Sequence, residues 1–216
     1  MWIPQGAPGL VLFAHGSGSS RHSPRNRAVA EFLHRAGLGT LLFDLLTPEE
    51  EESERYTLHL RFDIGLLADR LGAATRWARS QPGVDRLGLG YFGSSTGAAA
   101  ALVASTRSGA PIDAIVSRGG RPDLAAGVLA QIESPALFIV GGYDEEVIRL
   151  NEAAYGRLSC EKALEIVPGA THLFEEPGAL ESVAALAADW FARHLRRHPH
   201  SAAQTGAEQV RQQYAP

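Results

Sequence analysis

The stretch "GYFGSSTGAAAAL" (residues 90–102) raises the question on which the fold and function of this chain depend. An apolar run leads to two glycines that enclose a pair of serines, and an alanine-rich segment follows. G-x-S-x-G between a strand and a helix is typical of a strained turn that presents a serine hydroxyl. An ordinary glycine turn shows the same letters, so the rest of the sequence has to separate the two interpretations.

The composition is that of a single globular domain. The chain has 216 residues, of which 45% are hydrophobic and 20% charged, and its net charge is −4. Nucleic-acid binding would call for a basic excess, so we expect no such partner. The lone Cys160 excludes an internal disulfide and a thiolate metal cluster. The sequence shows neither a signal peptide nor an apolar run long enough to span a bilayer. We therefore expect a cytoplasmic protein without a membrane partner. The sequence leaves open whether the chain forms a homodimer.

Short apolar runs alternate with helical patterns along the chain. The runs predict strands at 9–16, 38–44, 86–93, 113–120, 135–142 and 162–170. The helices are expected at 23–37, 62–83, 96–109, 145–158 and 177–198, with a short one from Pro122. This alternation predicts an α/β fold with a mostly parallel sheet and helices on both faces.

One domain is expected over residues 1–198, followed by a flexible polar tail at 199–216. The acidic segment 45–61 favours a solvated loop or a frayed helix, and its alternative interpretation is a flexible flap over a site. The short connection after 113–120 leaves no room for a cap domain.

Three chemically useful side chains follow predicted strands, at the edge where parallel sheets bind ligands. Ser95 ends the third strand, Asp144 follows the fifth and His172 follows the sixth. Serine, acid and histidine in this order are typical of an α/β-hydrolase triad. His172 would activate the hydroxyl of Ser95, and Asp144 would orient the imidazole. Asp123 is a rival acid, and Asp44 is less favoured because it precedes the serine.

Backbone amides beside the serine are expected to stabilise an oxyanion. Thr96 would supply one N–H, and the loop "HGSGSSR" (15–21) the other, from Ser17 in preference to Gly16. His15 is expected to shape that loop by hydrogen bonding rather than to catalyse.

Two arginines lie beyond the fourth strand, in "SRGGRPD" (117–123). Arg118 and Arg121 would either clamp a substrate carboxylate or pair with nearby acids. We find no H-E-x-x-H pattern, so we expect no metal, and no cofactor is required.

Five stretches of the sequence carry a family resemblance: "LFAHGSGSSRHSPRNR", "GYFGSSTGAAAAL", "VSRGGRPDLA", "FIVGGYDEEV" and "VPGATHLFEEPGAL". With these stretches the chain, from about residue 9 to 195, resembles the dienelactone hydrolase-like branch of the α/β-hydrolases. It is similar to a bacterial subgroup in which some members are fused to a phosphoribosyltransferase domain. The resemblance implies an eight-stranded sheet with an antiparallel second strand, and "WIPQ" (2–5) would be the remnant of an N-terminal hairpin. Dienelactone hydrolases proper use a cysteine nucleophile where this chain has Ser95, and Cys160 lies elsewhere.

The sequence therefore predicts a serine hydrolase that cleaves carboxylic esters of small acyl groups through an acyl-enzyme. Two alternatives stay open. One is a lactone or amide hydrolase on the same three residues, and the other is a non-catalytic, ligand-binding relative.

Overall fold

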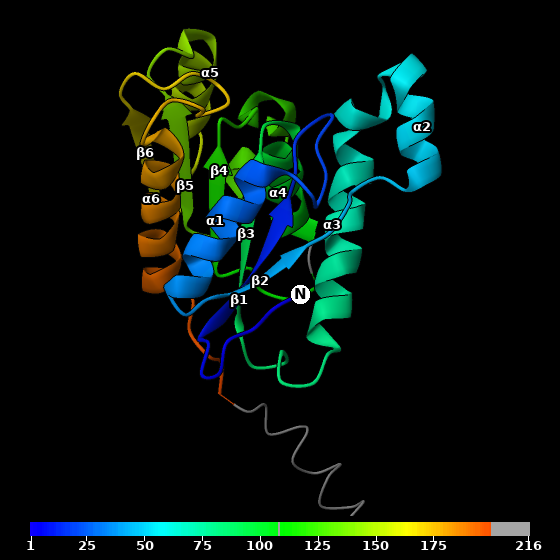
Figure 1. Cartoon of the computed structure of the whole chain (residues 1–216), viewed down its shortest axis with the longest axis vertical. Helices are drawn as coiled ribbons and strands as arrows, with labels where there is room; N and C mark the ends of the chain where they lie inside the picture. Colours follow the sequence, from blue (N-terminus) through cyan, green and yellow to red (C-terminus); the bar gives the residue numbers. More distant parts are fainter. Residues whose placement is uncertain (108, 200–216) are drawn as a thin grey trace, which may run out of the picture.

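The computed structural model describes residues 1–107 and 109–199, and these form an α/β domain around one twisted sheet (Figure 1). Six strands run parallel in the order β2-β1-β3-β4-β5-β6. Their bounds are β1 Gly9–Ala14, β2 Gly39–Leu42, β3 Gly88–Ser94, β4 Ala114–Arg118, β5 Ala136–Gly141 and β6 Lys162–Val167. The predicted tail at 199–216 lies, apart from Pro199, outside the described residues.

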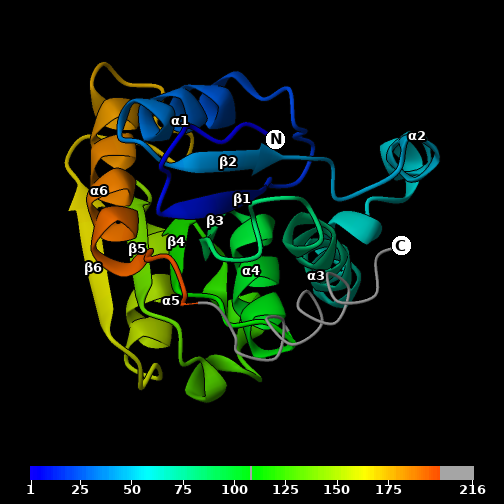
Figure 2. The same ribbon diagram turned by 90° about the horizontal axis from the view of Figure 1, so that it is seen from below.

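Helices cover both faces of the sheet, so β1, β3, β4 and β5 are buried along their full length. The helices are α1 Pro24–Arg35, α2 Pro48–Thr57, α3 Ile64–Arg79, α4 Thr96–Arg107, α5 Glu145–Tyr155 and α6 Ala179–His194. Three short 3₁₀ turns lie at Leu60–Phe62, Pro122–Ala125 and Leu129–Gln131. Figure 2 shows α1 and α6 on one face of the sheet and α3, α4 and α5 on the other. Each face carries its own hydrophobic cluster.

The expected eight strands with an antiparallel second strand are not found among the described residues. The N-terminal segment contributes one antiparallel bridge, in which Trp2 and Thr40 exchange two backbone hydrogen bonds of 2.9 and 2.8 Å. Pro4 follows, and its missing N–H prevents the ladder from continuing. The chain then turns at once, with the N–H of Ala7 bonded to the carbonyl of Pro4 at 3.1 Å.

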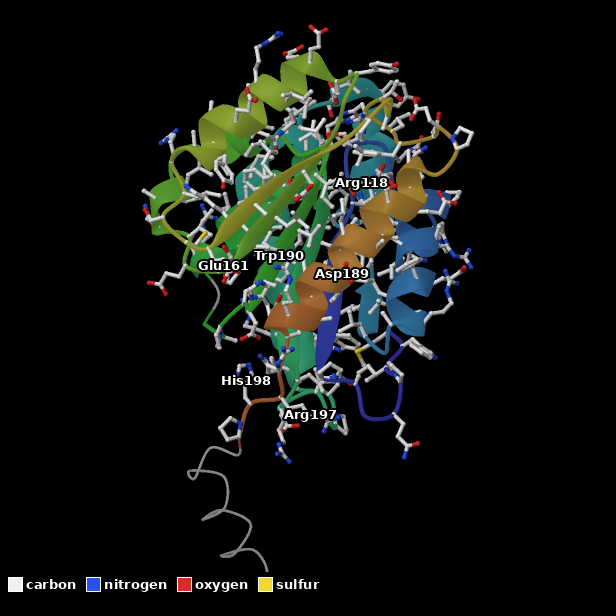
Figure 3. The ribbon with its side chains drawn as sticks, turned by 90° about the vertical axis from the view of Figure 1, so that its left-hand side faces the viewer. Arg118, Glu161, Asp189, Trp190, Arg197 and His198 are labelled. Atoms are coloured by element: carbon white, nitrogen blue, oxygen red, sulfur yellow. The ribbon has the colours of Figure 1, made fainter. Side chains whose placement is uncertain are left out.

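The last helix is shorter than predicted, because its final residues pass beneath the sheet instead. Leu195 packs against Gly9, where a Cβ would lie 2.7 Å from its side chain. His198 donates its N–H to the carbonyl of Arg86, and its Nε2 lies 3.2 Å from a carboxylate oxygen of Asp113. Figure 3 shows His198 below the lower end of the sheet. Tertiary packing, rather than helix periodicity, therefore decides where α6 ends.

The acidic segment is a helix and not a loop. Thr47 and Glu50 form a reciprocal capping box at the start of α2, with hydrogen bonds of 3.2 and 2.7 Å. Such a box satisfies backbone donors that an uncapped helix would leave free. Figure 1 shows α2 standing at the end of the molecule to which the strands point.

Candidate active site

Ser95 occupies a strained turn between β3 and α4. Its φ is 50°, a left-handed conformation that non-glycine residues seldom adopt. Gly93 and Gly97 have no space for a side chain: a Cβ on Gly93 would lie 2.7 Å from the amide nitrogen of Ala98, and one on Gly97 would overlap the carbonyl oxygen of Ala14. The turn therefore has the local geometry of a nucleophile elbow.

The two adjacent serines have different environments. Ser94 is buried, and its hydroxyl donates to Oδ1 of Asn26 in α1 at 3.4 Å. Ser95 is half-buried, and its hydroxyl makes no hydrogen bond within the part of the chain that the structure describes. Of the pair, Ser95 is the one whose oxygen is free to attack a substrate.

His172 and Asp144 are in direct contact. Nδ1 of His172 lies 2.6 Å from Oδ2 of Asp144, the distance of a strong, charge-assisted hydrogen bond. Asp144 is the N-cap residue of α5, yet its side chain makes no capping bond, since the carboxylate faces the imidazole. The loops that carry the two residues are joined by backbone bonds of 2.9 Å, from Gly142 to Val167 and from Tyr143 to Ala170. This pairing fixes the acid and the histidine relative to each other.

The imidazole lies over the backbone that also holds the serine. A Cβ on Gly119 would be 3.4 Å from Cε1 and 3.5 Å from Nδ1 of His172. The backbone carbonyl of the preceding residue, Arg118, accepts a hydrogen bond of 3.2 Å from the N–H of Ser95. No hydrogen bond joins the Ser95 hydroxyl to His172 among the described residues. In many enzymes this bond is long until substrate binds, so its absence does not remove His172 as the candidate base.

The rival acids have other partners. Asp123 receives two hydrogen bonds, of 2.9 and 2.8 Å, from the guanidinium of Arg121, and that hydrogen bonding lowers its pKa. Asp44 is paired with Arg21. Both carboxylates are thus occupied away from His172.

The residues expected to hold an oxyanion lie together. The hydroxyl of Ser17 is 3.1 Å from that of Thr96, which ties the loop after β1 to the start of α4. A Cβ on Gly16 would lie 3.1 Å from Cβ of Ser95, so the loop approaches the serine closely. Neither the Ser17 nor the Thr96 amide has a hydrogen-bond acceptor among the described residues.

The ring of His15 fixes this loop by hydrogen bonds. Its Nε2 accepts a hydrogen bond of 3.0 Å from the N–H of Leu45, which leaves the proton on Nδ1, 3.0 Å from the carbonyl of Gly16. The buried ring therefore uses one nitrogen within the loop and the other to join the loop to the segment after β2.

A narrow pocket opens beside these amides, with about 210 Å³ of empty space. It is lined by His15, Gly16, Ser17, Gly18, Leu45, Leu46, Glu51, Arg61, Leu67 and Thr96. Its floor is apolar, from Leu45, Leu46 and Leu67, and α2 contributes Glu51 to its wall. The acidic segment, expected to be a solvated loop, a frayed helix or a flexible flap, thus contributes residues to a pocket.

Glu54 holds the end of that wall. Its inaccessible carboxylate receives hydrogen bonds from the N–H groups of His59, Leu60 and Arg61, from the Arg61 side chain, and from the hydroxyl of Thr57. Burial by itself would raise the pKa of Glu54, but these bonds outweigh it and lower the pKa to about 2. Glu54 therefore stays charged throughout the physiological range.

Glu54 and Arg61 are the residues that sequence reasoning missed. The spacing of Thr47 and Glu50 carried a detectable signal for the helix. Nothing in a run of glutamates distinguishes the buried one, because its burial depends on how the chain returns after α2.

Replacement of Gly97 by alanine is expected to lower the free energy of unfolding by about 3 kcal/mol, because the new Cβ meets backbone that cannot rotate away. Urea denaturation measures this change. Gly127→Ala is the control, since a Cβ there meets nothing within 4 Å, and its effect is expected to stay within about 1 kcal/mol. Equal effects of the two substitutions would contradict the close packing of the turn.

No group of three or more His, Cys, Asp or Glu side chains in residues 1–107 and 109–199 is placed to hold a metal ion. Over the same residues, no helix has the length and apolar character needed to cross a bilayer.

Known proteins resemble this chain in sequence and in fold. The model of the dienelactone hydrolase family matches residues 3–197. The chain belongs to this family of hydrolases. A dienelactone hydrolase structure from Anabaena variabilis is 60% identical to it, with a TM-score of 0.87 and coverage of 90% of each chain. Est1E from Butyrivibrio proteoclasticus shares the fold, at 16% identity, a TM-score of 0.70 and coverage of 88% of this chain and 93% of that one.

A protein of Mycobacterium tuberculosis (strain H37Rv) is 56% identical over 193 residues. Its name is "Putative phosphoribosyl transferase Rv0571c". The match covers 89% of this chain and 43% of that protein. The present chain thus spans less than half the length of this relative.

Proposed function

We propose that this chain is a serine hydrolase that cleaves carboxylic esters of small acyl groups. The observation that carries the proposal is the contact of 2.6 Å between Asp144 and His172, beside a serine held at a φ of 50°. An imidazole with one nitrogen fixed by a carboxylate can accept a proton at the other nitrogen. That is the activation a serine hydroxyl needs near neutral pH.

The reaction has two halves. In the first, Ser95 attacks the ester carbonyl while His172 takes the hydroxyl proton, and the amides of Ser17 and Thr96 hold the oxyanion that forms. His172 then gives the proton to the departing alcohol, which leaves an acyl group on Ser95. In the second half His172 takes a proton from water, which attacks the acyl carbonyl. His172 then gives that proton to the oxygen of Ser95 as the bond to the acyl carbon breaks, which releases the carboxylic acid and restores the free serine.

The narrow pocket beside the Ser17 and Thr96 amides, with its apolar floor, supports small acyl groups. We expect activity on p-nitrophenyl acetate and butyrate and a decline for acyl chains beyond about eight carbons, whose added methylenes would find no further apolar surface. Activity that rises steadily past eight carbons would contradict this substrate class.

A lactone is the second candidate substrate. A lactone is a cyclic ester, and a structural relative at 60% identity is named a dienelactone hydrolase. A panel of lactones and linear esters of equal carbon number decides between them by kcat/KM.

Covalent labelling by a fluorophosphonate tests whether the chain is an enzyme at all. The reagent forms a bond with an activated serine, and peptide mapping should find it on Ser95. An unlabelled chain would favour the non-catalytic, ligand-binding alternative.

A further inference from the structure

Arg118 is a buried cation on the face of the sheet opposite α4. The side chains of neighbouring strand residues alternate between faces. Ser117 faces α4, since its hydroxyl fills the space beside Gly120 and Ala98. Arg118 therefore faces the layer of α1 and α6, as does Ser94, its register partner on β3, which bonds to Asn26 of α1. Figure 3 shows Arg118 toward the end of the sheet where α6 begins.

The guanidinium of Arg118 lacks the partners that a buried charge requires. The residue is only 8% exposed, and its Nε and Nη1 atoms are buried without a hydrogen bond. Its side chain forms no ion pair with any residue in the described part of the chain. Buried polar groups are nearly always hydrogen-bonded, and a buried charge left unpaired is costly.

A second cation, Arg25, lies close to Arg118 and makes a bound anion more favourable there. Burial, and then repulsion from Arg25 at the start of α1, lower the pKa of Arg118 to about 10, so the group keeps its charge at neutral pH. Nη1 of Arg25 binds Glu175 at 2.6 Å, but that carboxylate is 61% exposed, and Nε of Arg25 is itself buried without a partner.

The start of α1 adds to the positive potential. The helix begins at Pro24 and has no acidic residue in its first turn. Helix N-termini carry a partial positive charge and favour anions. Three unpartnered guanidinium nitrogens thus lie near a helix terminus whose first turn carries no acidic residue.

We propose that Arg118 and Arg25 form a binding site for a small oxyanion, a carboxylate or phosphate group, between β4 and the start of α1. A planar guanidinium matches such a group with two parallel hydrogen bonds. Arg118 is only 8% exposed, so the bound group is a free anion or the terminal group of a larger ligand. Neither arginine lines the pocket beside Ser17 and Thr96.

The test measures thermal unfolding of the full chain in increasing sodium phosphate or sodium acetate, with sodium chloride keeping the ionic strength constant. A ligand that binds only the native state raises Tm by mass action. The parent chain is expected to show a rise that saturates, and Arg118→Met is expected to lose it. Arg27→Gln is the matched control, because it removes an exposed charge from the same helix and should leave the response unchanged.

The proposal is overturned if neither anion raises Tm of the parent beyond chloride, or if Arg118→Met responds as the parent does. If Arg118→Met does not fold, Arg25→Gln keeps the buried cation and should raise the midpoint concentration about tenfold. An unchanged midpoint would equally overturn it.

Kinetics separate the two sources of the anion. If the site binds a carboxylate of the substrate, phosphate should raise KM for an ester whose acyl group carries a carboxylate. If the site binds a free anion, phosphate should leave that KM unchanged. Because unfolding is the primary readout, the result stands whether or not the chain proves to be an esterase.

Discussion

Replacement of Ser95 by alanine is expected to lower kcat for p-nitrophenyl acetate by a factor on the order of 10⁴ to 10⁶. The hydroxyl is the only group proposed to bond to the acyl carbon, and alanine removes it while leaving the turn between β3 and α4 in place. The remaining rate would come from substrate binding and from the amides of Ser17 and Thr96. Steady-state kinetics, with a test for a burst of p-nitrophenol, measure the loss.

Ser94→Ala is the control for that substitution. It removes a hydroxyl one position away, whose oxygen is buried against Asn26 on the other side of the turn. We expect kcat to stay within about tenfold of the parent, because losing one weak buried hydrogen bond costs about 1 kcal/mol. The assignment of the nucleophile is wrong if Ser94→Ala loses activity and Ser95→Ala keeps it.

Replacement of Asp144 by asparagine is expected to lower kcat about 10⁴-fold. The carboxylate accepts the Nδ1 proton of His172 at 2.6 Å, which leaves Nε2 free to take the proton of Ser95. The amide of asparagine can instead donate to Nδ1, which favours the opposite tautomer and gives no charge to balance the imidazolium. Kinetics with p-nitrophenyl acetate check the fall in kcat.

Glu145→Gln controls for the loss of charge near this site. Glu145 follows Asp144 in the first turn of α5, and His172 has its hydrogen bond with Asp144 instead. A change of less than about threefold is expected, in line with the small effects of exposed charges. If both variants lost activity equally, the local field rather than the Asp144 contact would be responsible.

Local sequence predicted most of the architecture because its signals are short-range. A strand buried on both faces has to be continuously apolar, and Pro24 after Ser23 suits only the start of a helix. Gly93 and Gly97 indicated the turn for a similar reason, since their neighbours leave no room for a Cβ. These constraints act within a few residues, so the sequence displays them directly.

The N-terminal hairpin and the end of α6 were predicted less well. Pro4 limits the N-terminal hairpin to a single bridge. Helix α6 ends before Leu195, because Leu195 packs against Gly9. For the acidic segment the sequence analysis left a loop and a frayed helix open, although Thr47 and Glu50 could have identified a capped helix start.

The sequence by itself determined the parallel α/β sheet, the position of the serine turn and the order of the three triad candidates. Only the tertiary structure decided which acid meets His172, because Asp123 and Asp144 both follow strands and differ in their partners. It also decided that Glu54 is held by a returning loop and that Arg118 is buried without a counterion. Such pairings join residues far apart in the chain, and no local pattern of side chains records them.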